Sequence, residues 1–581
     1  MTTIRQGVRA WMARRAVAAG ALALVGVYTY AQGVDEAVRR DAVRRDQQEQ
    51  RRQGERDRVQ REAMPRPADV FGAAGASEPA RGWPATESPC FAIERIELDG
   101  DAAADFTWAL EPLTLEADGA LGRCLGTEGL GVAVGRVQQR LMERGFVTTR
   151  VLLPPQDLSG GALTLTLLPG RISAIRFVTG TRDRATWRNA VPARVGDILN
   201  LRDIEQGLEN LKRVPTVQAD IRIEPAEQPG YSELVISWTQ SFPFRFSASV
   251  DDSGTKSTGR YQGSVTASYD HWWTLNDLFY LTLNRDLGGG IPGRRGTRGH
   301  TAHYSLPWGY WLLGATASDS SYHQNVAGAE QDYIYSGGSQ SAEVQLSRLV
   351  HRNASSKTTL NLKGWLRRSY NFIDDTELQT QRRATGGWEL GLSHKVSMDR
   401  TTLEIGASHR QGTGAFRAMP APEEAFGEGT SRMRVSRIDI NLQAPFQLAG
   451  HNLRYQGVLR GQWNGTPLSP QDRFAIGGRY TVRGFDGESS LSAERGWLLR
   501  NEFGVPLGDS GHELYLGLDY GQVSGPATEW LVGDHLAGVV LGLRGGVKGV
   551  SYDLFIGRPV RKPAYFRTAP VTAGFSLSTS F

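Results

Sequence analysis

One pattern repeats through residues 241–581: segments of about ten residues alternate apolar and polar side chains, and turns rich in Gly, Asn, Asp and Pro separate them. In RYQGSVTASYD (260–270), Tyr261, Val265 and Tyr269 share one face, opposite glutamine, serine and threonine. Successive side chains of a strand point to opposite faces, so each segment should form a strand with one apolar and one polar face. A soluble sandwich needs a compact apolar core, whereas a membrane barrel turns apolar faces to lipid and polar faces to its lumen. The pattern predicts a transmembrane β-barrel of about 16 antiparallel strands, at roughly twenty residues for each strand and loop.

The last segment, VTAGFSLSTSF (571–581), carries the same alternation to the C-terminus. Phe575, Leu577 and Phe581 lie on one face, and serine, threonine and glycine lie on the other. A terminal phenylalanine on the lipid side resembles the signal by which bacterial outer-membrane barrels are recognised for insertion. The resemblance implies a place in the bacterial outer membrane, with outer-membrane lipid and the barrel-assembly machinery as partners.

The N-terminus is typical of an exported protein. Four arginines precede an apolar run over residues 16–28, which is too short to span a bilayer, and small residues follow before Gln32. Residues 1–31 are therefore predicted to be a signal peptide, with an uncleaved anchor helix as the alternative. No later stretch reaches eighteen apolar residues, so the sequence offers no further membrane-spanning helix.

Residues 32–63 are almost entirely charged or glutamine, with acids and bases near i,i+4 spacing, which favours a helix. A helix that is polar all round cannot pack in an apolar core. It either stands in water as a spacer or occupies a polar cavity. Residues 64–88 are rich in Pro, Ala and Gly and are predicted to be a flexible linker.

Two segments of similar length follow, residues 89–171 and residues 172–240. Each is expected to run strand, helix, helix, strand, strand, with the second helical pair near 184–190 and 201–213. This repeated order looks like tandem POTRA domains, the α+β periplasmic modules of outer-membrane transport proteins. The stretch GFVTTRVLLPPQDLSGGALTLTLLPGRI (145–172) resembles the end of the first such domain in two-partner-secretion transporters.

The chain has only two cysteines, Cys90 and Cys124, and both fall in the first of these segments. Two cysteines cannot form a structural zinc site by themselves. In an exported domain a disulfide between them would clip the helical connection to the first strand, contributing roughly 3 kcal/mol by loop-entropy estimates. Two buried thiols are the alternative.

The sequence offers little sign of catalysis. It contains neither G-x-S-x-G nor H-E-x-x-H, and its ten histidines are scattered without ligand spacing. The net charge of +5 is small for this length, whereas a nucleic-acid binder would gather basic charge on one domain. We expect no enzyme activity, cofactor, metal or nucleic-acid partner, although a barrel lipase with a Ser/His pair is left open by pattern alone.

One arginine and one aspartate stand out in the barrel region. RYTVRGFDG places Arg483 among glycines and small polar residues. In the strand ELYLGLDYGQV (513–523) the leucines face lipid, so Gly517, Asp519 and Gly521 face the lumen. Glycines two residues either side of a carboxylate leave room around it for a cation. Arg483 is the candidate, because a guanidinium binds a carboxylate through two parallel hydrogen bonds.

The neighbours of Arg483 fit a loop tip. Val482 precedes it, Gly484 lets the chain turn sharply, and Phe485 is expected to pack against the barrel wall. The V-R-G-F motif, the G-x-D-x-G strand and the terminal phenylalanine together resemble the superfamily of polypeptide-transporting barrels with POTRA domains. The resemblance implies that a loop of about residues 465–493 folds back into the lumen and is held there by Arg483 and Asp519.

The whole arrangement resembles the two-partner-secretion (TpsB) transporters, which secrete haemolysins, filamentous haemagglutinin or contact-dependent toxins. The resemblance implies that residues 32–63 form a helix that plugs the barrel lumen. It also implies a partner: a large secreted β-helical exoprotein of the TpsA type, taken up unfolded and conducted to the cell surface without ATP.

The second POTRA domain, which adjoins the barrel, is predicted to capture this partner by pairing along an edge strand beside a helix. The residues assigned to this edge are Val217, Ala219, Ile221 and Ile223. Two other functions share parts of the pattern. A barrel-assembly insertase shares the loop but usually carries more POTRA domains, and a passive porin shares only the barrel.

Overall fold

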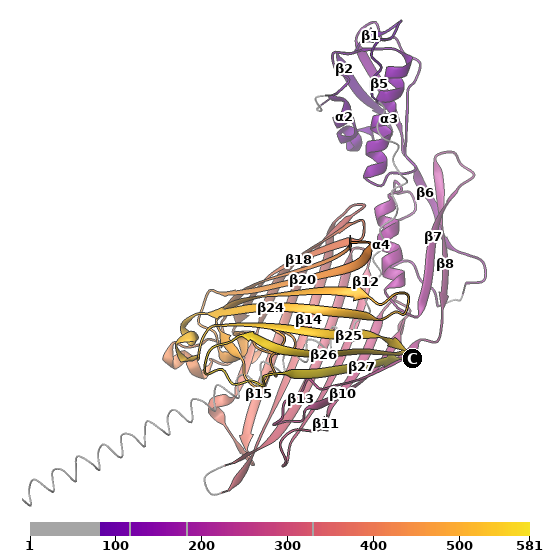
Figure 1. Cartoon of the computed structure of the whole chain (residues 1–581). Helices are drawn as coiled ribbons and strands as arrows, with labels where there is room; N and C mark the ends of the chain where they lie inside the picture. Colours follow the sequence, from indigo (N-terminus) through magenta and orange to yellow (C-terminus); the bar gives the residue numbers. More distant parts are fainter. Residues whose placement is uncertain (1–81, 115–117, 182–183, 328–330) are drawn as a thin grey trace, which may run out of the picture.

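The computed structural model describes residues 82–114, 118–181, 184–327 and 331–581. The predicted signal peptide (1–31), the polar helix (32–63) and all but the end of the predicted linker (64–88) lie outside these residues. The described chain forms a large closed barrel with two small domains at one end (Figure 1).

The barrel has sixteen long antiparallel strands within the described residues, which confirms the predicted fold class and strand number. A two-residue strand, β16 (Thr376–Glu377), adds to one hairpin, and β27 pairs with β9 to close the ring. The long strands, in chain order, are β9 (Phe244–Asp251), β10 (Tyr261–Asp270), β11 (Leu278–Gly288), β12 (Gly296–Trp308), β13 (Trp311–Ala327), β14 (Asp332–Arg352), β15 (Ser356–Ile373), β17 (Arg383–Met398), β18 (Thr401–Thr413), β19 (Arg434–Leu448), β20 (His451–Asn464), β23 (Arg495–Pro506), β24 (Glu513–Ser524), β25 (His535–Val547), β26 (Val550–Arg561) and β27 (Thr572–Ser580).

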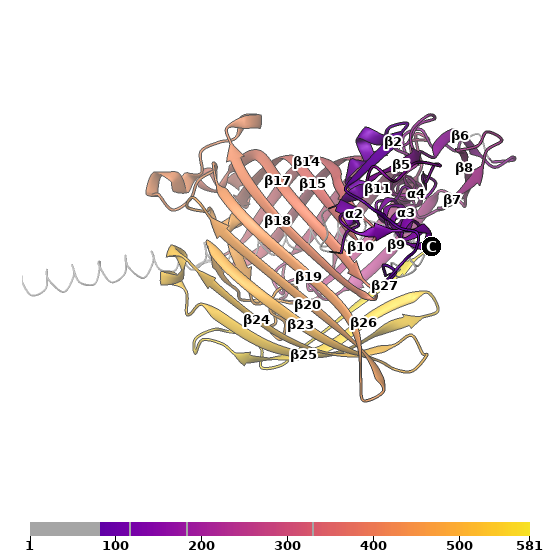
Figure 2. The same cartoon turned by 90° about the horizontal axis from the view of Figure 1, so that it is seen from above.

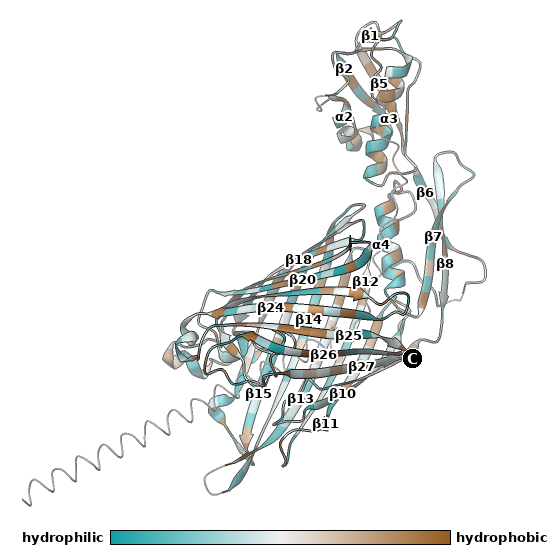
Figure 3. Cartoon of the chain, in the orientation of Figure 1, coloured by the Kyte–Doolittle hydropathy of each residue, from teal (hydrophilic) through white to brown (hydrophobic). Residues whose placement is uncertain are grey.

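The strands alternate in polarity as the sequence predicts. On β24, Leu514, Leu516 and Leu518 are exposed on the outer wall, while the alternating Tyr515 and Asp519 are buried on the inner side. Hydrophobic and hydrophilic stretches accordingly interchange along the barrel strands (Figure 3). A barrel closed in this way satisfies every interior backbone hydrogen bond without water, as a lipid environment requires.

The first small domain contains a three-stranded sheet in the order β2-β5-β4, formed by β2 (Arg95–Gly100), β5 (Ala162–Leu168) and β4 (Arg150–Leu152). The helix α3 (Thr127–Glu143) packs on it through its apolar face, with a 3₁₀-helix (Ala103–Leu110) and α2 (Glu111–Thr114) beside it. A short pair, β1 (Phe91–Ala92) and β3 (Cys124–Leu125), lies next to a disulfide between Cys90 and Cys124, whose Cα atoms are 5.2 Å apart. Among the described residues no helix is both long and apolar enough to cross a bilayer.

The end of the predicted flexible linker is bound to this first domain. The Trp83 indole Nε1 donates to the Asp118 carbonyl at 2.7 Å, and the ring lies under the guanidinium of Arg136. The Glu87 carboxylate accepts backbone N–H groups at the start of α3, including that of Glu128 at 2.8 Å. Helix N-termini favour such anions, so residues 82–88 are held rather than free.

The second domain repeats the plan with β6 (Arg171–Phe177), β8 (Tyr231–Gln240) and β7 (Val217–Pro225) in the order β6-β8-β7, covered by α4 (Leu201–Lys212). The helix predicted near 184–190 is wrong, because residues 184–190 form turns. The Asn189 amide there donates to the carbonyl of Leu275, between β10 and β11, at 2.5 Å and to that of Pro307, near the end of β12, at 3.0 Å. Contacts outside the segment thus decide its conformation.

Helix α4 joins the second domain to the barrel. Arg352 at the end of β14 pairs with Glu205 and Glu209 of the helix, both at 3.0 Å. The Asn210 amide donates to the Gly309 carbonyl in the turn between β12 and β13 at 2.8 Å. Figures 1 and 2 show both domains at one end and on one side of the barrel. The polar face of α4 therefore contacts the rim of the barrel.

Candidate functional site: the luminal loop and its anchors

The connection between β20 and β23, residues 465–494, folds back into the barrel. Within it β21 (Phe474–Ile476) and β22 (Leu491–Ala493) form a short antiparallel pair. Apolar side chains of the loop and the surrounding wall make one buried cluster, formed by Ile476, Val482, Phe485, Leu491, Ala493, Leu498, Val523, Ala527, Leu536 and Phe566. This cluster fixes the loop so that its tip presents Arg483 to the inner wall.

Arg483 binds Asp519 through three hydrogen bonds. Its Nε and Nη2 donate to the two carboxylate oxygens at 2.7 and 2.8 Å, and its backbone N–H donates to Oδ2 at 2.9 Å. The Asp519 side chain is 0% exposed and the Arg483 side chain 7% exposed. The structure therefore brings together the two residues that the sequence analysis paired, in the bidentate geometry expected for arginine and carboxylate.

A second carboxylate completes this site, and the sequence analysis missed it. Arg483 Nη1 donates to Glu502 Oε2 at 2.6 Å, and Glu502 Oε1 accepts from Arg544 Nη2 at 2.6 Å. Glu502 lies on β23 directly opposite Gly517 of β24. The available signal was a lumen-facing glutamate on the strand next to the G-x-D-x-G strand, but its register with that strand cannot be read from one sequence.

The glycines around the anchor leave space that the arginine occupies. A Cβ added to Gly517 would lie 2.5 Å from Arg483 Nη2, and one on Gly521 would lie 2.8 Å from a methyl group of Val482. Gly484 has φ +92°, and a Cβ there would lie 2.5 Å from the Arg558 carbonyl oxygen. A left-handed backbone and this close approach both require glycine at position 484.

The neighbours of Arg483 pack where the loop meets other loops. Val482 is fully buried in the apolar cluster. The Phe485 ring stands edge-on to the ring of Phe566, with centroids 5.7 Å apart. Phe566 lies in the connection between β26 and β27, so Phe485 packs against that connection as well as the wall. Gly538 of β25 also matters, because a Cβ there would clash with the Arg483 carbonyl oxygen; the sequence analysis missed this glycine.

The residues assigned to partner capture do not present their side chains to a partner. Val217 and Ala219 are 5% and 7% exposed, and Ile221 and Ile223 pack against the same core. Capture by pairing along this edge strand stays a prediction, and it would use the backbone because the apolar side chains face their own domain. The backbone edge remains: among the described residues β7 pairs only with β8, and the side chain of Asp220 faces outward.

The C-terminal strand has the orientation that the sequence analysis expected for most of its residues. Phe581 is 82% exposed and Leu577 is exposed, whereas Phe575 is half-buried beside Tyr261. Phe246 and Phe581 exchange two backbone hydrogen bonds, at 2.8 and 3.1 Å.

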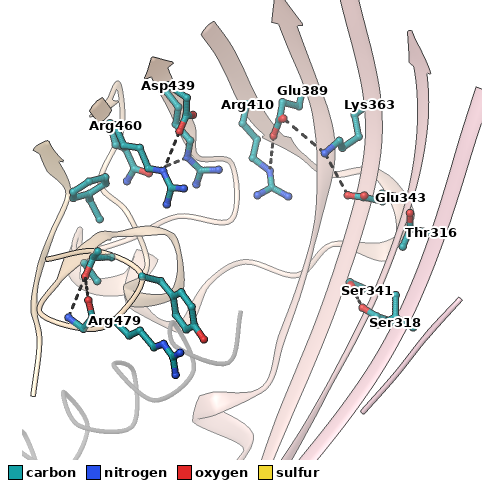
Figure 4. Close-up of a pocket in the computed structure, with 18 of the residues that line it drawn as sticks. Thr316, Ser318, Ser341, Glu343, Lys363, Glu389, Arg410, Asp439, Arg460 and Arg479 are labelled. Carbon is teal, nitrogen blue, oxygen red and sulfur yellow. Dashed lines mark hydrogen bonds and ion pairs between the residues drawn. The ribbon is translucent and has the colours of Figure 1, made fainter. Parts of the chain in front are cut away.

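A cavity of about 1350 Å³ fills the lumen between α4 and the loop. Its lining includes twelve basic and eight acidic side chains, together with many serine and threonine hydroxyls. Lys363 lies between Glu343 at 3.5 Å and Glu389 at 3.9 Å, and Arg410 approaches Glu389 at 3.6 Å (Figure 4). Charges on neighbouring strands thus pair with one another. No group of three His, Cys, Asp or Glu side chains gathers as a metal site in the described parts of the chain.

Comparisons with known proteins agree with this architecture. Residues 230–545 match the family model described as haemolysin secretion/activation protein ShlB/FhaC/HecB, residues 91–170 match a POTRA domain of the ShlB type, and residues 171–225 match a POTRA domain. The outer membrane transporter CdiB-2 of Burkholderia pseudomallei is 38% identical over 85% of this chain and 87% of its own length. The hemolysin transporter protein ShlB of Serratia marcescens is 25% identical over 77% of this chain and 78% of its own.

Two solved structures of outer-membrane transporters superpose on nearly the whole chain. The structure of CdiB from Acinetobacter baumannii superposes with a TM-score of 0.81 at 30% identity, covering 93% of this chain and 99% of that one. CdiB from Escherichia coli gives a TM-score of 0.77 at 26% identity, with 93% and 98% covered.

Proposed function

The chain belongs to the ShlB/FhaC/HecB family of two-partner-secretion transporters, and from this premise we propose that its lumen conducts an unfolded exoprotein across the outer membrane. It is an outer-membrane transporter with POTRA domains in the periplasm.

The observation that carries this proposal is the polar, charge-paired lining of the luminal cavity. An extended polypeptide exposes backbone N–H and C=O groups that must be hydrogen-bonded along the whole path. Hydroxyl groups such as those of Ser318 and Ser341 can supply these bonds, and neither has a net charge. Because Lys363 and Arg410 are paired to glutamates, neither of them offers a bare charge that would hold the passing chain in place.

Capture is proposed at the backbone edge of β7. An extended segment can add to an exposed strand edge through main-chain hydrogen bonds, which demand no particular sequence. The helix α4 is bonded to the barrel rim through Glu205 and Glu209, so its polar face is not a groove for the partner. A segment held on β7 would lie next to the barrel end at which α4 sits.

The partner is proposed to be a large β-helical exoprotein of the TpsA type, taken up unfolded. Several relatives of high similarity carry the name CdiB, which favours a contact-dependent toxin over a haemolysin as the cargo. The proposed driving force is folding of the exoprotein at the cell surface, which prevents its return; no ATP would be consumed.

Residues 32–63 are proposed to close the lumen in the resting transporter. Residues 33–62 carry nine arginines and eight acidic residues, so the segment is nearly neutral and polar all round. Such a helix suits a cavity lined by both signs of charge better than it suits an apolar core.

Photo-crosslinking through the lumen tests the proposal. The exoprotein encoded beside the transporter gene would be fused to a tightly folded domain that stalls it during passage. A photoreactive residue in place of Ser341, which lines the cavity, should crosslink to the stalled chain. The matched control replaces Val344 on the outer wall of the same strand, which is exposed toward lipid and should give no such product. Crosslinking from Val344 alone would refute a luminal path.

A further inference from the structure

The junction between the first and last strands is the least extensively paired in the barrel. Five residues on each side pair across it, from Ser247 with Ser580 to Asp251 with Ser576. Every other pair of neighbouring long strands in the described barrel joins at least eight. Toward the cell surface the ladder stops at the Asp251–Ser576 pair. The junction between β9 and β27 therefore has fewer backbone hydrogen bonds than the other junctions between long strands of the described barrel.

One residue beyond this pair, side chains supplement the backbone ladder. The backbone N–H of Asp252 donates a long hydrogen bond of 3.4 Å to the Phe575 carbonyl. The Phe575 N–H donates to the Asp252 carboxylate at 2.9 Å. Arg479 of the luminal loop donates to the Phe575 carbonyl at 3.0 Å and to the same Asp252 oxygen at 3.1 Å. Arg479 and Asp252 together bond both backbone groups that Phe575 turns toward the seam.

The Arg479–Asp252 pair lies in a shielded, closely packed place rather than on the open surface. The side chains of Asp252 and Arg479 are 7% and 18% exposed. A Cβ on Gly574 would lie 2.9 Å from the Asp252 carboxylate, so glycine leaves the carboxylate its space. The Arg479 guanidinium also lies over the Phe555 ring, 4.8 Å from its centroid. Hydrogen bonds between ionised groups shielded from water are stronger than neutral ones.

The same loop thus reaches two distant parts of the barrel wall. Arg483 binds Asp519 on β24, while Arg479, four residues earlier, binds Phe575 of β27 and Asp252, the residue after β9. Glu488 adds a third contact, because its carboxylate accepts the Lys256 backbone N–H at 3.1 Å.

We propose that Arg479 and Asp252 are positioning residues through which the luminal loop closes the β9–β27 seam. The loop then links β24 to the region after the first strand, and displacement of its tip would remove the Arg479 bonds to Asp252 and Phe575. This inference goes beyond the proposed role of the Arg483 anchor, and its test requires no secretion.

The test measures the temperature at which the folded barrel converts to the slower-migrating unfolded form in SDS electrophoresis. Arg479→Ala should lower that temperature by roughly 2–4 °C, the size of shift expected from loss of a single strong interaction in a large domain. Arg479→Lys should recover only part of it, because an ammonium lacks the planar guanidinium that lies over the Phe555 ring. Arg260→Ala is the matched control: Arg260 pairs with Asp252 at 3.3 Å, but its side chain is 45% exposed, and the change should leave the temperature unaltered.

A disulfide across the β9–β27 seam shows whether Arg479 stabilises the seam or only the loop. Ser249 and Ser578 face each other in the ladder, three residues from the hydrogen-bonded Phe246–Phe581 pair, so they form a non-hydrogen-bonded pair. Cα atoms in such pairs are about 4.5 Å apart, which suits a disulfide. Cysteines at both positions, when oxidised, should return Arg479→Ala to the wild-type temperature.

Reduction should remove this restoration, and the wild type under the same reductant controls for the Cys90–Cys124 disulfide. A wild-type temperature for Arg479→Ala would overturn the proposal. So would failure of the oxidised crosslink to restore the variant, which would assign Arg479 to the loop alone.

Discussion

Arg483→Ala is expected to reduce the amount of exoprotein in the medium by about a hundredfold, with the exoprotein held back in the periplasm. The change leaves the fully buried Asp519 carboxylate with the backbone N–H of residue 483 and, among the described residues, with Arg500 at 3.8 Å as its remaining ion-pair partner. Removing one partner of a buried ion pair costs about 3–5 kcal/mol. Each 1.4 kcal/mol is a factor of ten in an equilibrium, so the docked loop would lose at least two orders of magnitude in population.

The control for this variant is Arg437→Ala, another luminal arginine, which bonds Gln462 at 3.0 Å and does not touch the loop tip. It should secrete near the wild-type level. Both variants should still insert, as judged by heat-modifiable migration of the barrel. Equal secretion by Arg483→Ala and Arg437→Ala would show that secretion does not need the Arg483 anchor.

Deleting residues 33–62 is expected to raise single-channel conductance in planar bilayers several-fold. If the polar helix closes the lumen, its removal opens a cavity that is already lined with polar and charged groups. The lining has twelve basic and eight acidic side chains, so the open channel should also prefer anions, measured as the reversal potential in a salt gradient.

A matched variant replaces residues 33–62 with a Gly/Ser segment of the same length. It keeps the chain length but cannot form a stable charged helix, so it should conduct as the deletion does. If the deletion conducts like the wild type, these residues do not close the lumen. If the deletion raises the conductance but the Gly/Ser variant does not, any segment of that length closes the lumen and the helix is not required.

The period-two alternation was enough to predict the barrel, because lipid outside and water inside impose opposite chemistry on the two faces of each strand. Asp519 could be found because glycines at 517 and 521 mark the space around it. Glu502 and Gly538 could not, because their places depend on the register of β23 and β25 against β24. The Arg479–Asp252 contact joins residues 227 apart in sequence and depends on how the barrel closes.

The wrong helix and the buried capture residues both have physical causes outside local sequence pattern. The segment near 184–190 is shaped by bonds from Asn189 to the barrel, which local helix propensity does not register. Val217 and Ala219 are apolar, and on an edge strand of a small domain such side chains belong to the core. The predicted capture along this edge would therefore use the backbone of the strand and its polar neighbours.

The most direct measurement of the central claim is secretion by charge-reversed anchors. Arg483→Asp with Asp519→Arg reverses the pair, but the new aspartate would face the Glu502 carboxylate, which lies 2.6 Å from Arg483 Nη1 in the wild type. We therefore expect the double variant to secrete as poorly as either single variant, and the triple variant with Glu502→Gln to regain part of the wild-type level. A triple variant that inserts normally yet secretes no more than Arg483→Asp alone would contradict an anchor made by Arg483 between Asp519 and Glu502.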